Sequence, residues 1–429
     1  MARSVEKMMD KLQKESFEFF LREHNSVKGL VRDKSDARSP SSIAGIGFAL
    51  AAYVVAVERG FMKRSEALQR TLAVVNFFSG SRQSAEEDAT GYRGFYYHFL
   101  DMKTGRRAWR CELSTIDTGL LLLGMLTAAE YYSGDNARER EVRERVGELY
   151  NRVDWNWARN RALTISNGYK PKQGFLKYRW QGYSEGMLLY ILGLGSPTHP
   201  LPVESYQAWT QTYQWRQVYD YEFLYGGPLF IHQFFHAWCD FRGLQDDFMR
   251  KRSIDYFENS RRATYIQREY CRQNPLGFKG YSEMNWGLTS SDGPGPAVRK
   301  INGRTQKFYG YCARGVPAGP DDGTISPWAA VTSLPFAPEI VLPTIEYFYK
   351  MEMGKGEHYG FEASFNPTFH NSSPEHIWRS KCNFAINQGP LVMMMENYRS
   401  GLIWQLMRNC RPLVTGLRRA GFRGGWLPP

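Results

Sequence analysis

The stretch Trp180-Gln-Gly-Tyr-Ser-Glu-Gly-Met-Leu-Leu-Tyr-Ile-Leu-Gly-Leu-Gly-Ser-Pro-Thr-His-Pro200 sets the pattern for the whole chain. One acid, Glu185, stands between aromatic residues and an uncharged apolar run that ends at Pro197. This pattern predicts a short buried helix with a carboxylate in its first turn. Such a carboxylate either caps the helix as an anion or is a chemical group whose protonated form is favoured by apolar surroundings.

Uncharged helices of this kind recur, and each is followed by an amphipathic one. The apolar helices are predicted over 43–57, 113–132, 183–194, 230–241, 326–334 and 387–395. Their amphipathic partners are predicted over 65–78, 138–153, 202–212, 246–270, 338–349 and 399–407, and a further outer helix over 8–24. Because a helix that is apolar all round must be enclosed, six inner helices sheathed by outer ones are expected.

The pairing predicts an all-α fold, an (α/α)6 barrel or toroid, with short β segments in loops at 94–99 and 174–180. No Pro/Ser-rich linker divides the 429 residues, so a single domain over 1–429 is expected. The longest uncharged apolar run, 43–57, is shorter than the roughly 20 residues of a membrane-spanning helix. We therefore expect no membrane partner.

The net charge of +12 raises the question of nucleic acid. Most basic residues are mixed with acids, as in 138–144, which is typical of a solvated helix face, and no nucleic-acid-binding motif accompanies them. We therefore expect no nucleic-acid partner, and the oligomeric state stays open. An aromatic share of 15% suits the stacking of sugars as well as core packing.

The six cysteines are widely scattered and form no C-x-x-C pair, which favours free thiols over disulfides or a metal site. We expect no cofactor and no metal. The first residues show no apolar signal region, so a cytoplasmic location is the simplest expectation, with a periplasmic or secreted one if a leader was removed.

Acids gather before the second apolar helix. His98 and Asp101 close the segment 94–101, and Glu112 and Asp117 follow within 109–119. Ser114 and Asp117 have the Ser-x-x-Asp spacing of a capping box, so a purely structural role is a serious alternative. A cap alone does not require so many acids.

Three later stretches combine acids with aromatic rings. Trp286 and Asp292 lie in 281–296, where Asp-Gly-Pro-Gly is also turn chemistry. Asp321 and Asp322 precede the apolar helix at 326–334, and the segment 358–367 offers two stacking rings beside Glu362, Tyr359 and Phe361. Carboxylates with aromatic rings, and without nucleophile-elbow, Walker or metal spacings, are expected of glycoside chemistry, in which two acids cleave the bond and rings hold the sugars.

Five of these stretches resemble, in order, the motifs of the bacterial glucoamylase-like family, which includes endo-β-1,2-glucanases and the transglycosylase domain of cyclic β-1,2-glucan synthases. They are 94–101, 112–119, 182–200, 286–294 and 320–339. The family has an (α/α)6 barrel, in agreement with the helix pairing. Two departures from its pattern are the segment 295–307 and Trp328, and both are expected near the cleft.

The resemblance places Glu185 at the family's catalytic acid and the segment from Glu112 to Asp117 in the region of its other essential carboxylates. It implies a hydrolase acting on β-glucan, most simply β-1,2-glucan or its oligosaccharides. Glu185 would protonate the leaving oxygen, and Asp117, with Glu112 as second candidate, would activate or position a water. The residues expected to bind substrate are His98, Asp101, Trp180, Tyr183, Trp286, Asp292, Asp321, Asp322, Tyr359 and Phe361.

Three alternatives remain open at this point. One is transglycosylation, in which a carboxylate attacks the anomeric carbon and a sugar replaces water. Another is a glycan-binding protein without catalysis. The third is a cyclase or isomerase that uses Asp321 and Asp322 as general acid or as ligands of a metal diphosphate.

Overall fold

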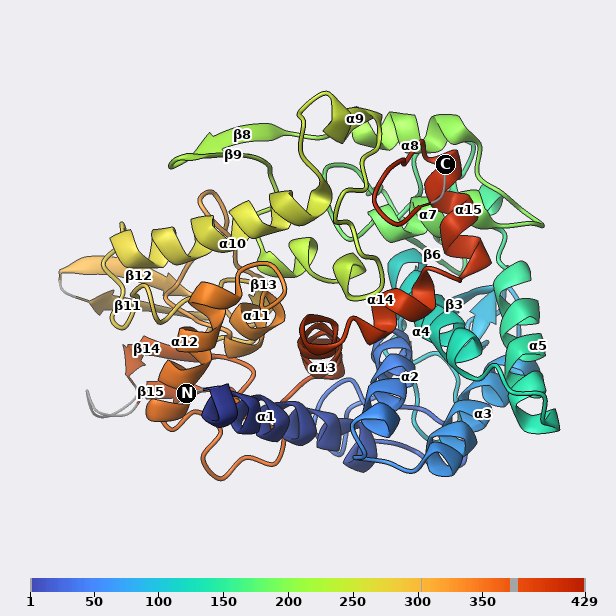
Figure 1. Ribbon diagram of the computed structural model, residues 1–429, viewed down its shortest axis with the longest axis horizontal. Coiled ribbons are helices and arrows are strands. Elements are labelled where there is room, and N and C mark those ends of the chain that lie inside the picture. The colour runs from blue at the N-terminus through green and yellow to red at the C-terminus, as the bar shows by residue number, and fades with distance from the viewer. Residues whose placement is uncertain (1, 302, 371–376, 428–429) are drawn as a thin grey trace.

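Helices make up most of the ordered structure (Figure 1). The computed structural model describes residues 2–301, 303–370 and 377–427. None of the described helices combines the length and hydrophobicity needed to cross a lipid bilayer.

Five nearly enclosed helices form the inner part of the molecule. They are α2 (Ile43–Glu58), α4 (Thr115–Tyr131), α7 (Met187–Gly195), α11 (Pro327–Thr332) and α13 (Ala385–Arg399). Every residue of α7 and α11 is buried. Helix α2 packs between α4 and α13, α4 also contacts α7, and α11 contacts α13. At these five places the apolar runs correctly predicted buried helices.

The crossing of α2 and α4 is unusually close because both helices have a glycine there. A Cβ atom on Gly124 would lie 2.0 Å from the carbonyl oxygen of Gly47. Only a residue without a side chain fits at this point. The close approach brings together the N-terminal ends of two inner helices and the loops that precede them.

The predicted inner helix at 230–241 is instead two turns of 3-10 helix, η1 (Leu229–His232) and η2 (Phe235–Ala237). Its backbone N–H groups bond three residues back, as from Gln233 to Phe230 and from Trp238 to Phe235. Hydrophobic periodicity cannot distinguish the two kinds of helix here, since either one buries the same apolar side chains.

The outer helices cover these inner elements. They are α1 (Ala2–Arg22), α3 (Arg64–Gly80), α5 (Ala137–Asn151), α8 (Val203–Thr210), α10 (Tyr256–Gln273) and α12 (Pro338–Lys350), with the short α6 (Trp155–Ala158), α9 (Asp247–Arg250), α14 (Leu402–Met407) and α15 (Arg411–Arg419). The helix predicted over 246–270 is divided into α9 and α10. Asp246 and Asp255 each accept a hydrogen bond from a backbone N–H two or three residues into the helix that follows, so each begins a new helix.

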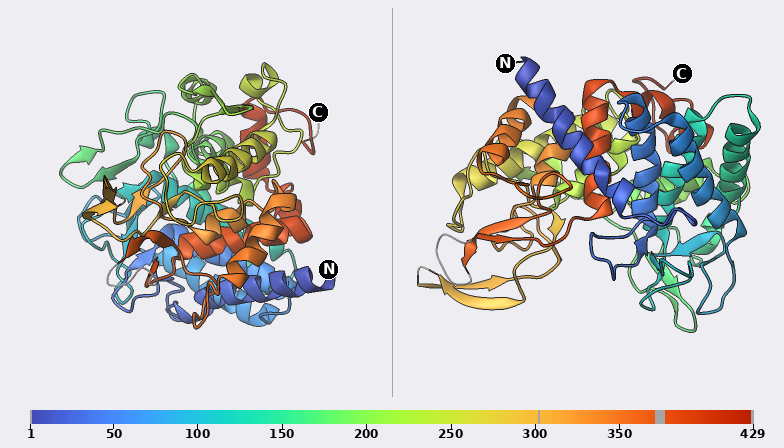
Figure 2. Two further views of the ribbon diagram at one scale, coloured as in Figure 1. Left: turned by 90° about the vertical axis from the view of Figure 1, so that its left-hand side faces the viewer. Right: turned by 90° about the horizontal axis from the view of Figure 1, so that it is seen from below.

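Strands are short and lie at one end of the helices, whereas both termini lie toward the other end (Figure 2, right). A five-stranded antiparallel sheet runs in the order β2 (Gly91–Tyr92), β3 (Phe95–Tyr97), β5 (Leu113–Ser114), β6 (Gly168–Lys170) and β7 (Gly174–Phe175). Strand β1 (Ser41–Ser42) pairs with β4 (Phe99–Leu100), and β10 (Ser290–Ser291) with β13 (Cys312–Ala313).

Three hairpins complete the strands: β8 (Trp215–Val218) with β9 (Tyr221–Leu224), β11 (Ala297–Ile301) with β12 (Arg304–Phe308), and β14 (Phe365–His370) with β15 (Ile377–Arg379). The predicted β segment at 94–99 contains β3, and only the first two residues of 174–180 form a strand. The segment 295–307, which departs from the family pattern, is built around the β11–β12 hairpin, which extends away from the body of the molecule (Figure 2, right).

Candidate active site

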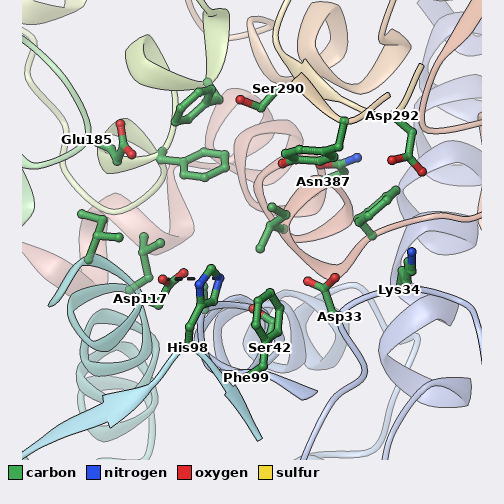
Figure 3. A pocket seen from close by; sticks show the side chains of 18 of the residues that line it. Asp33, Lys34, Ser42, His98, Phe99, Asp117, Glu185, Ser290, Asp292 and Asn387 are labelled. Atoms are coloured by element: carbon green, nitrogen blue, oxygen red, sulfur yellow. Dashed lines mark ion pairs between the residues drawn. The ribbon is translucent and has the colours of Figure 1, made fainter. Parts of the chain in front are cut away.

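A cavity of about 400 Å³ opens at the end of the inner helices where the strands gather. Four residues that the sequence singled out line it: Glu185, Asp117, His98 and Asp292. Other lining residues come from the loops before α2 and α13, from η1 and from β10, so segments distant in sequence meet here. Figure 3 shows that Glu185 lies above Asp117 and His98 on one side of the cavity, with Asp292 on the opposite side.

The five-stranded sheet places His98 and Asp117 next to each other. Strand β3 ends directly before His98, and its partner β5 leads directly into α4. The backbone N–H of His98 donates to the carbonyl of Glu112 over 3.0 Å, which extends this pairing by one residue. The two side chains are thus set by neighbouring strand ends, not by flexible loops.

His98 bridges two carboxylates. Its Nδ1 lies 2.9 Å from Oε1 of Glu112, and its Nε2 lies 3.5 Å from Oδ2 of Asp117. Burial alone would lower the pKa of His98, but the charges of Asp117 and Glu112, with that of Asp33, raise this pKa to about 9. His98 is therefore an imidazolium at neutral pH, and its hydrogen bond lowers the pKa of Glu112.

This bridge predicts a pH-dependent contribution to stability. The folded protein holds the His98 proton more tightly than the unfolded chain, whose histidine has a pKa near 6.5. The stabilisation is complete below pH about 6.5 and is lost as the pH rises through about 9. We expect the free energy of unfolding of wild type, measured with urea, to fall between pH 6.5 and 9. The free energy of unfolding of His98→Gln should fall much less over the same range.

The same substitution at His24, whose pKa is lowered by burial, is the control. The free energy of unfolding of His24→Gln should fall between pH 6.5 and 9 as that of wild type does. Equal pH dependence in wild type and His98→Gln would show that the imidazolium bridge does not form.

Of the two hydrogen bonds expected of a capping box at Ser114 and Asp117, only the one accepted by Ser114 forms. The Ser114 hydroxyl oxygen accepts the N–H of Asp117 over 3.2 Å, which caps α4. The carboxylate of Asp117 does not bond a backbone N–H in return: the Ser114 hydroxyl donates to it, and it faces His98 and the cavity. The serine therefore caps the helix and leaves the aspartate free to face a ligand.

Glu185 lies two residues before α7 and not inside its first turn. The helix begins at Met187 without a side-chain cap, and the Ser184 hydroxyl accepts the N–H of Gly186 over 3.2 Å. The capping role considered for Glu185 is thus wrong. Its carboxyl group points into the cavity (Figure 3).

The surroundings favour the protonated form of Glu185. The pKa of this carboxyl is raised to about 7: burial raises it most, the N–H of Glu185 itself lowers it, and the negative charge of Asp117 adds a smaller upward shift. A carboxylic acid that keeps its proton near neutral pH, beside a carboxylate held by an imidazolium, is the arrangement required of an acid and a base that work on one bond.

A second acidic cluster lines the opposite side. Burial raises the pKa of Asp33 to about 6, against the attraction of His98 and Lys34, and burial also raises the pKa of Asp292. Tyr311, which is 55% exposed, lies beside them. Lys34 and the carboxyl groups provide hydrogen-bond donors and acceptors for a polyhydroxylated ligand (Figure 3).

Several predicted substrate-binding rings do not reach this cavity. Trp286 is fully buried and donates its indole N–H to Thr344, and Phe361 packs against Phe348 and Tyr349 in the core. These two positions are corrected: their aromatic faces are used by the protein core.

The other three rings lie close to the functional segments but behind them. Trp180 donates its indole N–H to Thr115 over 3.0 Å, and Tyr183 stacks on Tyr256. The hydroxyl of Tyr359 donates to Glu23. None of the three lines the cavity, so their assignment to substrate binding stays a prediction.

The remaining acids serve structure. Asp101 is exposed and accepts the backbone N–H groups of Lys103 and Thr104, as an Asx turn does. Asp321 accepts the hydroxyl groups of Tyr270 and Tyr281. These contacts explain why neither residue lies in the cavity.

Asp322 forms a buried ion pair with Arg314, both side chains having no exposed surface, at 2.7 Å and 2.8 Å. Neighbouring Asp321 is held by other partners, so the proposed metal-diphosphate use of the two acids is wrong. Among the described residues there is no group of three or more potential His, Cys, Asp or Glu metal ligands.

Breaking this pair should have a large effect on stability. Asp322→Ala leaves the Arg314 charge buried without its partner, and we expect the free energy of unfolding to fall by about 3–5 kcal/mol. Asp247→Ala breaks an exposed pair with Arg250 and should change it by less than about 1 kcal/mol. Urea denaturation measures both; similar small changes in the two variants would contradict the structural role of Asp322.

Sequence reasoning missed a large part of the cavity wall. The missed residues are Asp33, Lys34, Ser42, Phe99, Trp109, Phe230, Phe234, Ser290, Tyr311, Phe384 and Asn387. About half lie in loops before predicted inner helices, and Phe99 and Ser290 also lie in the motifs 94–101 and 286–294. Trp328, the second departure from the family pattern, also lines the cavity.

Comparison with known proteins identifies the family. The sequence profile of the family described as "Putative glucoamylase" matches residues 177–411, more than half of the chain. The chain belongs to this glucoamylase family. The resemblance seen in the five motifs is thereby confirmed.

Solved structures of similar proteins share the whole fold. A structure described as a putative glucoamylase from Bacteroides uniformis is 31% identical, with a TM-score of 0.87, and the match covers 99% of each chain. An endo-β-1,2-glucanase from Chitinophaga pinensis, solved in complex with sophorotriose and glucose, is 28% identical, with a TM-score of 0.86 and 99% coverage of each chain.

A curated relative from Parabacteroides distasonis is an exo-β-1,2-glucooligosaccharide sophorohydrolase acting at the non-reducing end. It is 26% identical over 450 residues, and the match covers 96% of this chain. The chain spans 58% of the length of that relative.

Proposed function

We propose that this member of the glucoamylase family is a glycoside hydrolase that cleaves β-1,2-glucan or its oligosaccharides. The observation that carries the proposal is Glu185, a carboxylic acid with a pKa near 7, placed in one cavity with Asp117 and its imidazolium partner. The names of the relatives from Chitinophaga pinensis and Parabacteroides distasonis support the choice of β-1,2-glucan.

In the proposed reaction, Glu185 donates its proton to the leaving glycosidic oxygen while a water attacks the anomeric carbon. Asp117 takes a proton from that water or positions it, and the contact with His98 holds Asp117 in place. At the end of the reaction Glu185 is ionised and Asp117 carries the proton taken from the attacking water, and proton exchange with solvent restores the starting states of both groups. Glu112 acts through His98, because it does not line the cavity.

We also propose that the helices form one (α/α)6 toroid that is a single domain. The packing of α2 between α4 and α13 and the enclosure of α7 and α11 support this arrangement, with η1 and η2 in place of the sixth inner helix. All six cysteines are free, which supports a reducing compartment such as the cytoplasm.

The test is a product assay across linear and cyclic β-glucans of several linkages, read by product size and by anomeric configuration. The proposal expects reducing-sugar release from β-1,2-glucan in preference to the β-1,3, β-1,4 and β-1,6 polymers. Larger products formed with a sugar acceptor would support transglycosylation instead. Binding of β-1,2-glucan without any product would show a protein that binds glycans and does not cleave them.

A further inference from the structure

A second cavity adjoins the proposed active site, and one residue belongs to both. The second cavity has a volume of about 710 Å³ and is lined by segments 24–26, 37–40 and 101–103 with Arg32, Arg107 and Ala108. Trp109 is the residue common to the two linings. Arg32 lines the second cavity, and the next two residues, Asp33 and Lys34, line the first. The loops that contain residues 32–42 and 99–109 therefore contribute to the walls of both cavities.

The ring of Trp109 is exposed to solvent, and the backbone conformation of Trp109 is one that a bulky residue rarely adopts. Its exposed fraction is 65%, which is high for an indole ring in a soluble protein. Trp109 and Arg110 both have positive φ, 52° and 51°, and are the central residues of a turn closed by the hydrogen bond from Cys111 N–H to Ala108 C=O. Such turns strongly favour Asn and Gly at these two positions, so a Trp-Arg pair is strained.

The strained turn is held firmly in place. The Arg107 guanidinium donates to the carbonyl of Cys111 over 2.6 Å and to that of Arg110 over 2.8 Å. The Trp109 ring packs on Phe99 with ring centres 5.0 Å apart, and Phe99 stacks on His98 at 3.9 Å. The exposed indole is therefore a fixed platform whose inner neighbour, Phe99, lies beside His98 (Figure 3).

The second cavity is suited to a polyhydroxylated chain. Arg32, Arg38, Lys103 and Arg107 provide hydrogen-bond donors, and Asp101 provides acceptor oxygens that face the same space. Polar groups around one flat apolar face are the combination that binds a sugar ring, because the ring stacks while its hydroxyl groups form hydrogen bonds.

We propose that Trp109 and this second cavity form an additional glucan-binding subsite, which holds glucosyl units beyond those in the active cavity and passes the chain across the indole ring. The inference rests on the proposed function, because it assumes a glucan in the first cavity. It assigns preference for longer chains to Trp109 and leaves bond cleavage to Glu185 and Asp117.

The experiment compares steady-state rates on β-1,2-linked substrates of increasing length for wild type, Trp109→Gly and Trp109→Phe. Glycine fits the positive φ of the turn, so the first variant removes the ring without adding strain. We expect Trp109→Gly to raise KM for long chains about tenfold more than KM for the shortest cleaved substrate, the loss of one stacking contact. Trp109→Phe should restore most of the loss.

Tyr178→Ala is the matched control, since Tyr178 is 73% exposed and lines neither cavity. It should behave as wild type on every chain length. Calorimetric titration of long and short glucans into each variant in a Glu185→Gln background gives the same comparison without turnover.

Unchanged KM for long chains in Trp109→Gly, or an equal loss on the shortest substrate, would overturn the subsite. If wild type neither binds nor cleaves any β-1,2-glucan, the proposed function fails and this inference fails with it. Normal cleavage by wild type with no length-dependent effect of Trp109 would reject the subsite alone. Binding to the second cavity that disappears in salt and responds equally to an unrelated polyanion would identify a site for anions and also reject the proposal.

Discussion

Glu185→Gln is expected to turn over β-1,2-glucan about 10²- to 10⁴-fold more slowly than wild type. Its melting temperature and its affinity for glucan should be nearly unchanged. The amide has the shape of the carboxyl group but no proton to donate to the leaving oxygen. Because Glu185 does not cap α7, its replacement removes no helix-stabilising bond. Initial rates, thermal melting and calorimetric titration measure the three quantities.

The pH dependence of wild type belongs to the same prediction. Burial raises the pKa of Glu185 to about 7, so the acid form is lost and kcat/KM falls as the pH rises above that value. Glu130→Gln is the matched control. Glu130 is also a partly buried glutamate whose pKa is raised by burial, but it lines a different cavity. Wild-type turnover in Glu185→Gln, or an equal loss in Glu130→Gln, would contradict the assignment.

Asp117→Asn is the second variant with a large expected effect. The carboxylate can take a proton from water and the amide cannot, so turnover should fall by 10²-fold or more and the acidic limb of the pH–rate profile should disappear. Asp117→Asn should also lower stability at neutral pH, because the ion pair with His98 is lost, although the Ser114 cap of α4 remains.

Glu112→Gln distinguishes the two candidate bases. Glu112 contacts His98 and does not line the cavity, so its variant should lose less activity than Asp117→Asn. Normal turnover in Asp117→Asn together with an inactive Glu112→Gln would transfer the role of base to Glu112.

The buried helices could be predicted because their sequence leaves no polar face for solvent. The runs that contain α2, α4 and α7 are apolar on every side, which only an enclosed helix allows. The β11–β12 hairpin was missed, although Asn302-Gly303 between two alternating runs is the strongest short-range hairpin signal. The hairpin β8–β9 has only four residues in each strand and gives little pattern to detect.

The candidate site was predictable where a motif carries its acids or its histidine. Glu185 and Asp117 stand before or within the first turn of an inner helix, and both face the cavity. Asp33 carries no motif, and its place in the cavity wall depends on long-range packing. Trp286 and Tyr183 have motif positions but are used by the core, because sequence does not show whether an aromatic ring faces a ligand or another ring.

The central claim is that Glu185 protonates the leaving oxygen, and leaving-group dependence tests it most directly. Wild type and Glu185→Gln are compared on a β-1,2-linked glucosaccharide and on an aryl glycoside of the same sugar chain with a nitrophenol leaving group. A nitrophenolate departs without a proton, so the account predicts that Glu185→Gln loses orders of magnitude on the natural linkage and far less on the aryl glycoside. An equal loss on both substrates would contradict general-acid catalysis by Glu185.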